Sequence, residues 1–258
     1  MSKRIALVMG GARGIGFATC KKLVADCDAI AIADINGERA AESAKALQQQ
    51  SGKKVAGFAC DAGNRQDVAR LRKDIIETFG APSVLVNCAA IVDDKLFLDS
   101  TPADWNRIFS VCLFGTMHTL HEFLPDMAAA QYGRVVCLAS DSARLGQARL
   151  SYYAAAKGAV LALVKSIAQE LGGAGVTLNV VSPGATNTEM RQAREQTLAA
   201  SMGPEKYERR VKSVLKAYPL RRLGEPDDIA AMVHFLTTDD ASWVTGQVVS
   251  VNGGFAMA

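Results

Sequence analysis

The chain has 258 residues, of which 49% are apolar and 21% are charged, and its formal net charge at pH 7 is +3. This length suits one large α/β domain with a well-buried core, so we expect residues 1–258 to form a single domain. The small net charge gives no argument for a nucleic-acid partner. The first apolar stretch, Ile5 to Met9, is too short for a signal peptide or a membrane span.

Six cysteines are scattered along the chain, with no Cys-x-x-Cys pair among them. In a chain of this size that pattern favours reduced, mostly buried thiols over a disulfide framework. We therefore expect a cytoplasmic protein that has neither a membrane nor a nucleic acid as a partner.

Short apolar runs alternate with longer amphipathic stretches along the whole chain. The predicted strands are Ile5–Met9, Ala29–Ala33, Lys54–Ala59, Val84–Asn87, Arg134–Ala139, Thr177–Val181 and Gln247–Val251. The predicted helices are 14–26, 37–51, 64–79, 102–127, 152–172 and 226–237. Continuous apolar strands between helices imply a sheet that is covered on both faces. We predict an α/β fold of the doubly wound Rossmann type, with a seven-stranded, mostly parallel sheet flanked by helices.

Polar residues or glycines follow the predicted strands at their carboxyl ends. In chain order these are Gly10, Asp34, Asp61, Asn87, Ser140 and the segment Ser182-Pro183-Gly184. Ligands of open parallel sheets bind outside this edge. The strand ends therefore indicate a ligand site at the carboxyl edge of the sheet.

A glycine-rich turn, Gly10-Gly11-Ala12-Arg13-Gly14-Ile15-Gly16, joins the first predicted strand to the first predicted helix. Glycine allows a tight turn and close approach of a ligand to the backbone. The N-terminus of the following helix offers unpaired N–H groups to a pyrophosphate. The spacing is Gly-x-x-x-Gly-x-Gly, which differs from both the common Gly-x-Gly-x-x-Gly fingerprint and the P-loop. The position of the turn after the first strand predicts a dinucleotide site.

Asp34, at the end of the second predicted strand, bears on the choice of dinucleotide. A carboxylate here can accept hydrogen bonds from both ribose hydroxyls of NAD. It would repel the 2′-phosphate of NADP by ~1–4 kcal/mol at about 4 Å, depending on the local dielectric. Arg13 acts in the opposite direction because an arginine can pair with a phosphate. We expect NAD as the cofactor, with NADP the less favoured alternative.

Tyr153 and Lys157 are four residues apart on a predicted helix and therefore share one face. A free phenol has a pKa near ~10, and an adjacent ammonium favours the phenolate and lowers that pKa. The pair can then act as a proton donor and acceptor. Tyr152 cannot form the same pair, because the residue four positions on is Ala156.

These segments together resemble the classical short-chain dehydrogenase/reductase family over nearly the full length of the chain. The matching segments are Gly10-x-x-x-Gly14-x-Gly16, Cys60-Asp61, Asn87-Cys-Ala-Ala90, Ser140 with Tyr153-x-x-x-Lys157, Pro183-Gly184, Pro219-Leu-Arg-Arg-Leu-Gly-Glu-Pro-Asp-Asp228 and Val244-Thr-Gly-Gln-Val-Val-Ser-Val-Asn-Gly-Gly254. Within the family, the chain is most similar to 3-oxoacyl reductase-like members and to alicyclic hydroxyacyl-CoA dehydrogenases.

The resemblance implies a role for each matching position. Ser140, Tyr153 and Lys157 would be catalytic: Ser140 orients the substrate oxygen, Tyr153 exchanges a proton with it, and Lys157 binds the nicotinamide ribose and lowers the pKa of Tyr153. The cofactor-binding set would be Gly10, Arg13, Gly14, Ile15, Gly16, Asp34, Asp61, Ala62, Asn87, Ala89, Tyr153, Lys157, Pro183, Gly184 and Thr188. The hydride chemistry would belong to the cofactor, while the protein positions and polarises the reactants.

Cys112 is the most consequential departure from the family pattern. The family usually has a fourth catalytic asparagine at this position, and a thiol is a weak hydrogen-bonding group that replaces an amide poorly. This departure affects the relay of the proton from Lys157 to solvent and not the hydride step. The alternative reading of Cys112 is a small buried filler.

Residues 187–218 form a long insertion after the sixth predicted strand and carry seven basic and four acidic side chains. One reading is a lid over the substrate that attracts a phosphorylated or CoA-linked molecule. The other is a pair of solvated helices, because charge-rich helices usually face water. His118 and His121 could share a helix face, but no third ligand cluster lies near them in the sequence. We expect no metal there and read them as helix surface or a subunit contact in a homodimer or homotetramer.

The leading hypothesis is an NAD-dependent oxidoreductase that interconverts a secondary alcohol and a ketone. Its small-molecule substrate would be a hydroxyacyl-CoA or an alicyclic or aryl secondary alcohol. We expect the loop 91–99, residues 141–150 and the lid 187–218 to line the substrate pocket. Two alternatives remain: a non-catalytic dinucleotide-binding sensor or scaffold of the same fold, and an epimerase or dehydratase of the related extended family. The intact set of Ser140, Tyr153 and Lys157 disfavours the first, and the short chain disfavours the second.

Overall fold

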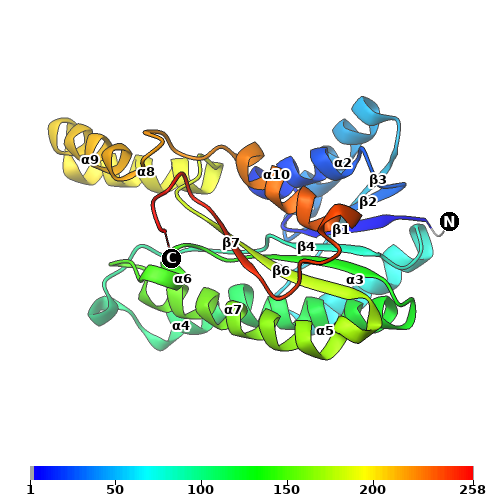
Figure 1. The fold of residues 1–258 in the computed structure, drawn as a ribbon. Helices are drawn as coiled ribbons and strands as arrows, with labels where there is room; N and C mark the ends of the chain where they lie inside the picture. The colour runs from blue at the N-terminus through cyan, green and yellow to red at the C-terminus, as the bar shows by residue number, and fades with distance from the viewer. Residues whose placement is uncertain (1–2, 258) are drawn as a thin grey trace.

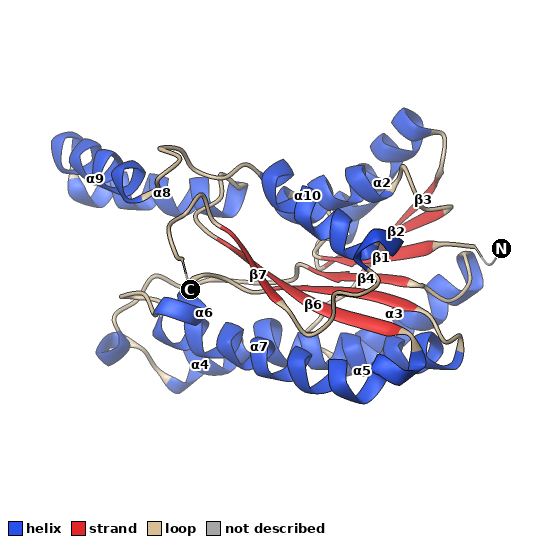
Figure 2. Ribbon diagram, viewed as in Figure 1, coloured by secondary structure: helices blue, strands red, loops and turns tan. Residues whose placement is uncertain are grey.

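The central sheet has seven parallel strands, as described by a computed structural model that covers residues 3–257 (Figures 1 and 2). The strands are β1 (Ile5–Met9), β2 (Ala29–Asp34), β3 (Lys54–Ala59), β4 (Val84–Asn87), β5 (Gly133–Leu138), β6 (Val176–Pro183) and β7 (Val248–Val251). All the predicted strands are present, and β1, β3 and β4 have the predicted bounds. Every pairing is parallel, so the sheet is wholly rather than mostly parallel.

The order of the strands is β3-β2-β1-β4-β5-β6-β7. The chain moves outward in one direction from β1 to β3 and in the other from β4 to β7. The direction of winding therefore reverses between β1 and β4, and their carboxyl ends leave a crevice at this point. Gly10 and Cys88 follow these two strands and lie at that crevice.

Helices cover both faces of the sheet (Figure 2). Their bounds are α1 (Gly14–Leu23), α2 (Gly37–Ser51), α3 (Arg65–Thr78), α4 (Pro102–Phe109), α5 (Gly115–Ala129), α6 (Ser142–Leu145), α7 (Ser151–Leu171), α8 (Glu189–Met202), α9 (Pro204–Ala217) and α10 (Pro226–Thr237). The doubly wound Rossmann architecture predicted from the sequence is confirmed.

Alternate residues of β1 face two separate apolar layers, as the two-residue period of a strand requires. Leu7 and Met9 pack in the layer formed with α3, α5 and α7. Ala6 and Val8 pack in the layer formed with α1, α2 and α10. Because apolar side chains cover both faces of the sheet, the polar groups that follow the strands lie at the ends of the sheet.

The helix predicted over 102–127 is interrupted. A π-helical turn at Ser110–Phe114 separates α4 from α5, and Cys112 lies at its centre. A π-helical turn holds about one residue more than an α-helical turn, so it breaks the regular 3.6-residue period of the helix. Hydrophobic patterning of the sequence alone does not reveal such a break. The interruption lies beside the ligand edge of the sheet.

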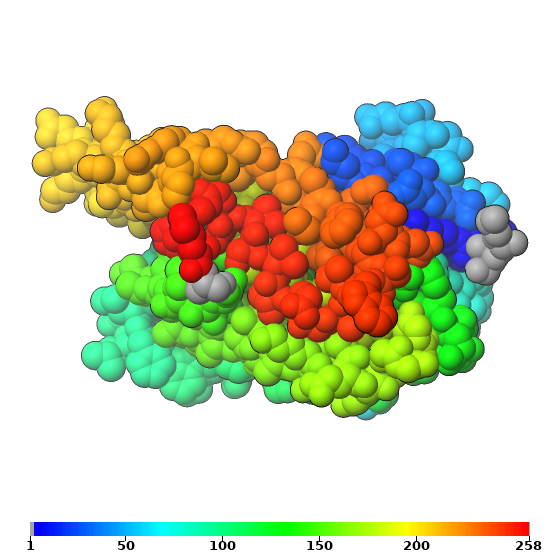
Figure 3. All heavy atoms as spheres, viewed as in Figure 1, coloured from blue at the N-terminus to red at the C-terminus, as the bar shows by residue number. Residues whose placement is uncertain are grey.

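Residues 187–218 contain α8 and α9, which project from the body as an arm (yellow to orange in Figures 1 and 3). Within these two helices, all of which the structure describes, no side chain is buried. This agrees with the reading of two solvated helices, although the first turn of α8 reaches the ligand edge. Among residues 3–257, no helix is long and apolar enough to cross a membrane.

Candidate active site

The glycine-rich turn between β1 and α1 is shaped by close backbone packing. Gly10 and Gly14 have φ of +69° and +53°, a region that side chains disfavour. A Cβ at Gly16 would lie 2.1 Å from the carbonyl oxygen of Gly10, so no larger residue fits there. Helix α1 begins with no side-chain cap in the described structure, whereas Asn36 caps α2. The first N–H groups of α1 therefore have no side-chain acceptor and can bind an anion.

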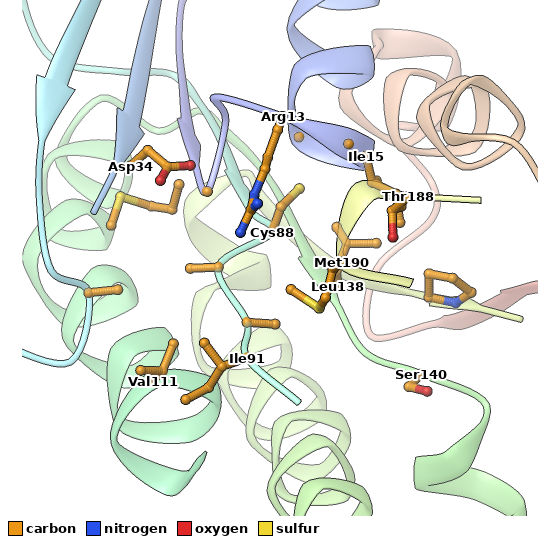
Figure 4. Close-up of a pocket in the computed structure, with 18 of the residues that line it drawn as sticks. Arg13, Ile15, Asp34, Cys88, Ile91, Val111, Leu138, Ser140, Thr188 and Met190 are labelled. Atoms are coloured by element: carbon orange, nitrogen blue, oxygen red, sulfur yellow. The ribbon is translucent and has the colours of Figure 1, made fainter. Parts of the chain in front are cut away.

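A cavity of about 320 Å³ runs along the carboxyl edge of the sheet from Asp34 to Ser140 (Figure 4). Most of the residues predicted for the site line it: Gly10, Arg13, Gly14, Ile15, Gly16, Asp34, Asp61, Ala62, Ala89, Ser140, Tyr153, Lys157, Pro183, Gly184 and Thr188. Its size falls within the usual range of small-molecule sites, about 300–1,000 Å³. The structure thus brings together residues that are up to 178 positions apart in sequence, from Gly10 to Thr188.

Asn87 is the exception, because it does not line the cavity in the described structure. Its side chain is buried, and its Oδ1 accepts a hydrogen bond from the Ala89 N–H at 3.1 Å. Asn87 therefore supports the wall that Ala89 forms. Its Nδ2 is buried without a partner among the described residues.

Carboxylates mark the end of the cavity that is distant from Ser140. Asp34 accepts hydrogen bonds from the N–H groups of Ala12 and Asn36, at 3.3 and 3.2 Å. Asp61 accepts one from the Gly63 N–H at 2.8 Å. Backbone donors therefore hold each carboxylate in place, for Asp34 from its own turn and from the glycine-rich turn, and each keeps acceptor capacity for a ligand.

Two arginines and one glutamate lie at the same end. Figure 4 shows Arg13 extending from the glycine-rich turn into the cavity. Its guanidinium is 3.7 Å from the carboxylate of Glu189, which also pairs with Arg39. Glu189 is the first residue of α8, so these ion pairs connect the arm to the nucleotide end of the cavity.

Tyr153 and Lys157 lie at the other end, one turn apart on α7. Lys157 is 2% exposed, and its ammonium donates a hydrogen bond to the carbonyl of Leu138 at 2.8 Å. Burial raises the pKa of Tyr153 above its ordinary value; the nearby Cys112 thiol adds to the shift and the Ser140 hydroxyl opposes it. Desolvation of the phenolate dominates this shift. That Lys157 lowers the pKa of Tyr153 stays a prediction.

Cys112 is fully buried and packs with Ile108, Tyr152 and Ala156 behind Tyr153. Its thiol donates a hydrogen bond to the carbonyl of Ile91 at 3.3 Å. This agrees with the reading of Cys112 as a small buried filler. The thiol also holds the loop that follows β4 through the Ile91 carbonyl.

Thiols form part of the wall between the two ends, which the sequence did not indicate. Cys60 and Cys88 both line the cavity. Burial raises the pKa of each to about 12, so both are neutral at pH 7. They act as apolar wall, and their scattered positions in the sequence carried no signal of this.

The substrate end was predicted less accurately. Ile91 and Met190 line the cavity, as expected for the segments 91–99 and 187–218, together with Val111 and Leu138. Of the described residues 141–150, none lines it. At the start of that segment the carboxylate of Asp141 is buried against Ser182 and Asn252, and near its end Arg149 pairs with Asp94.

Comparison with known proteins decides the family. A family model described as enoyl-(acyl carrier protein) reductase matches residues 10–256. Acetoacetyl-CoA reductase of Allochromatium vinosum is 33% identical over 255 residues, which cover 98% of this chain and 99% of the relative. The 2,3-dihydroxy-2,3-dihydro-p-cumate dehydrogenase of Pseudomonas putida is 34% identical over 254 residues, covering 98% and 95%. The 3-oxoacyl-[acyl-carrier-protein] reductase of Aquifex aeolicus is 31% identical over 251 residues, covering 97% and 96%.

The chain belongs to the short-chain dehydrogenase/reductase family. The resemblance inferred from the motifs is confirmed. As a member of this family, the protein is an oxidoreductase that acts on CH–OH groups and interconverts a secondary alcohol and a ketone with NAD(P) as cofactor.

The geometry of this short-chain dehydrogenase/reductase fits such a cofactor. The uncapped start of α1 and the glycine turn can receive a pyrophosphate. Asp34 lies at one end of the same cavity and Tyr153 at the other. Among residues 3–257, no three His, Cys, Asp or Glu side chains come together as metal ligands would.

Proposed function

We propose that the protein is an NAD-dependent oxidoreductase in which Tyr153 is the general acid/base and Ser140 orients the substrate oxygen. Lys157, one turn along α7, lowers the pKa of Tyr153 relative to the value that burial alone would give. The single observation that carries this proposal is the convergence of these three side chains with the glycine-rich turn on one cavity. Bound NAD would accept or return a hydride at the substrate carbon. The protein's part is to hold that carbon near Tyr153 and to manage the proton of the oxygen.

The proton step depends on the phenol of Tyr153. A hydroxyl at Ser140 can donate to the substrate oxygen while Tyr153 gives a proton to it or takes one from it. Because burial raises the pKa of Tyr153, the phenol is protonated at pH 7. That form is the one needed to reduce a ketone. The rate of alcohol oxidation should therefore climb with pH through the alkaline range, whereas ketone reduction should change little between about pH 6 and 8.

NAD rather than NADP is the proposed cofactor. Asp34 keeps a carboxylate at the end of β2, held by backbone N–H groups, and no cation pairs with it among the described residues. A 2′-phosphate would meet this charge directly. Arg13 and Arg39, which could compensate, are both paired with Glu189.

The proposed substrate is a hydroxyacyl-CoA or an alicyclic or aryl secondary alcohol. Apolar side chains, Ile91, Val111, Leu138 and Met190, line the substrate end of the cavity. Both classes have counterparts among the relatives, by the names acetoacetyl-CoA reductase and 2,3-dihydroxy-2,3-dihydro-p-cumate dehydrogenase.

The charges of the arm give limited support for a phosphorylated substrate. Four of its seven basic residues already pair with carboxylates; these are Arg191, Arg194, Arg210 and Lys212. The attraction expected from the net charge of residues 187–218 is therefore weaker than the sequence suggests.

We further propose that residues 1–258 work as one domain with 187–218 as a substrate lid, in a cytoplasmic homotetramer or homodimer. Large apolar side chains on the surface support the assembly: Trp243 is 99% exposed, and Phe114 and Met117 are exposed on and beside α5. Such side chains suit a protein interface. Free thiols throughout the interior suit a reducing compartment.

The test is a panel of secondary alcohols with NAD, and of the matching ketones with NADH, followed by absorbance of the reduced nicotinamide. The panel should include a 3-hydroxyacyl-CoA, a cyclohexanol derivative and a 1-arylethanol. We expect turnover with at least one class and a preference for NAD over NADP. Tight NADH binding without turnover on any member would favour the sensor or scaffold alternative.

A further inference from the structure

Ser142 lies directly behind Ser140, on the side away from the cavity. Its side chain is buried, with 3% of its surface exposed. Its backbone N–H and its hydroxyl both donate to the Oγ of Ser140, at 3.3 and 2.9 Å. The family pattern on which the site was predicted gives Ser142 no role, and the residue does not line the cavity.

These two donors constrain the hydroxyl of Ser140. A serine hydroxyl has one hydrogen to donate and two lone pairs to accept with. Ser142 occupies the accepting side, so the hydrogen of Ser140 is left for a partner in the cavity. Hydrogen bonds in such a series polarise one another, which makes the terminal donor stronger.

The segment that carries both serines is held rigidly. The carboxylate of Asp141 is 4% exposed and accepts hydrogen bonds from Ser182 Oγ at 3.1 Å and Asn252 Nδ2 at 2.7 Å. Its backbone N–H donates to the carbonyl of Pro183 at 3.1 Å. The turn 140–142 is therefore fixed to the end of β6 and to the C-terminal segment. Ser142 has little freedom to leave Ser140.

We propose that Ser142 is a positioning residue, which donates to Ser140 so that the Ser140 hydroxyl donates to the substrate oxygen. This inference rests on the proposed function, because it acts only through Ser140. It adds one member to the hydrogen-bonded series of the reaction: Ser142, Ser140 and then the oxygen of the ketone or alcohol.

The test compares Ser142→Ala with Ser182→Ala, a matched buried variant that loosens the anchor of Asp141 but keeps the donors to Ser140. Losing one hydrogen bond should lower kcat of Ser142→Ala by about three- to tenfold. KM and the Kd of NADH should stay within twofold. In the enzyme without substrate, the Ser140 hydroxyl donates to Tyr153 and lowers the pKa of its phenol. A weaker Ser140 donor stabilises the phenolate less, so the alkaline limb of kcat/KM for alcohol oxidation, which reports on the free enzyme, should move to higher pH by about half a pH unit.

Ser142→Thr, which keeps the hydroxyl, should recover most of the lost turnover and the original pH profile. A wild-type rate and profile in Ser142→Ala would overturn the inference. So would a loss that is equal at every pH and matched by Ser182→Ala, because that result would mean a structural role alone. Tyr153→Phe, assayed in parallel, reports on the proposed function separately: if it loses turnover while Ser142→Ala does not, only the role of Ser142 fails.

Discussion

The two ends of the cavity are built in different ways. The part of the nucleotide end between β1 and α1 is built from backbone: Gly10, Gly14 and Gly16 form a turn so close-packed that a Cβ at Gly16 would overlap a carbonyl oxygen. The substrate end consists of side-chain contacts between elements that are distant in sequence. A turn made of backbone is specified locally, whereas contacts between long side chains need the whole fold to bring them together.

The segment 91–95 after β4 shows the second kind of construction. Cys112 fastens Ile91, and Tyr152 and Arg107 both contact the carboxylate of Asp93. The next two residues of this segment form ion pairs: Asp94 pairs with Arg149 and Arg194, and Lys95 pairs with Asp104. Residues of α4, α7, α8 and two connecting segments thus contact four of these five consecutive positions. We expect this end to tolerate single changes better than the glycine-rich turn does.

Gly16→Ala should give the largest effect, because its methyl group has no room beside Gly10 O, 2.1 Å away. We expect NADH affinity to fall by about 100-fold or more, since the backbone that receives the pyrophosphate must move. NADH fluorescence titration measures this, and thermal melts show how much of the fold is lost.

The matched control is Gly172→Ala, where a Cβ meets no atom within 4 Å and φ is −56°. This variant should bind NADH like the wild type. Wild-type affinity in Gly16→Ala would mean that the turn is not the rigid cradle described above.

Asp34→Asn should change which dinucleotide is used. The substitution keeps the size and one acceptor of the side chain but removes its charge, so repulsion of a 2′-phosphate disappears. We expect the ratio of kcat/KM for NADP over NAD to rise by about tenfold or more. Steady-state kinetics with both cofactors measure the ratio, and Asp240→Asn, on an exposed 3₁₀ turn, is the control. An unchanged ratio would remove Asp34 from cofactor choice.

Asp94→Asn should weaken the substrate end and leave the nucleotide end intact. Burial alone would raise the pKa of Asp94, but the Arg149 and Arg194 guanidiniums together hold it below its usual value. The ion pairs are therefore present above the ordinary carboxyl pKa and are lost only as pH falls through the lowered one. We expect substrate KM to rise about three- to tenfold across neutral pH, with NADH Kd unchanged.

Glu208→Gln is the control for Asp94→Asn, since its pair with Lys212 is exposed and lies within α9. Glu208→Gln should change neither the substrate KM nor the Kd of NADH. If Asp94→Asn raised the Kd of NADH as much as the substrate KM, the two ends would not be separable.

Cys112→Asn should have the smallest effect. The amide can keep a donor for the Ile91 carbonyl, and it restores the residue type usual in the family. We expect turnover equal to the wild type or up to about threefold higher, with a lower Tm because the position is fully buried. Stopped-flow or steady-state assays suffice, with Cys137→Ala as the buried-thiol control. A collapse of turnover would show that the thiol has a role of its own.

The sequence predicted the fold and the nucleotide end well because both leave local patterns. Alternating apolar runs located the strands, and the residues that follow them, such as Asp34 and Ser140, line the cavity. Asn87 was placed at the cavity because strand ends were read without their side-chain direction. It comes directly before Cys88 and Ala89, which do line the cavity.

Three features could not be predicted, because none of them leaves a recognisable pattern in the sequence. The π-helical turn at Cys112 leaves no periodic signal. The raised pKa of Tyr153 comes from burial, which spacing to Lys157 does not reveal. Ser142 differs from other serines of the chain only in what it contacts.

The central claim is that the phenol oxygen of Tyr153 performs the proton step and contributes little to the affinity for the cofactor. Tyr153→Phe removes only the phenol oxygen, so NADH titration and turnover of the best substrate should be measured side by side on this variant. We predict that turnover falls by about 1,000-fold or more while the Kd of NADH stays within about threefold. Turnover within tenfold of the wild type would contradict the account.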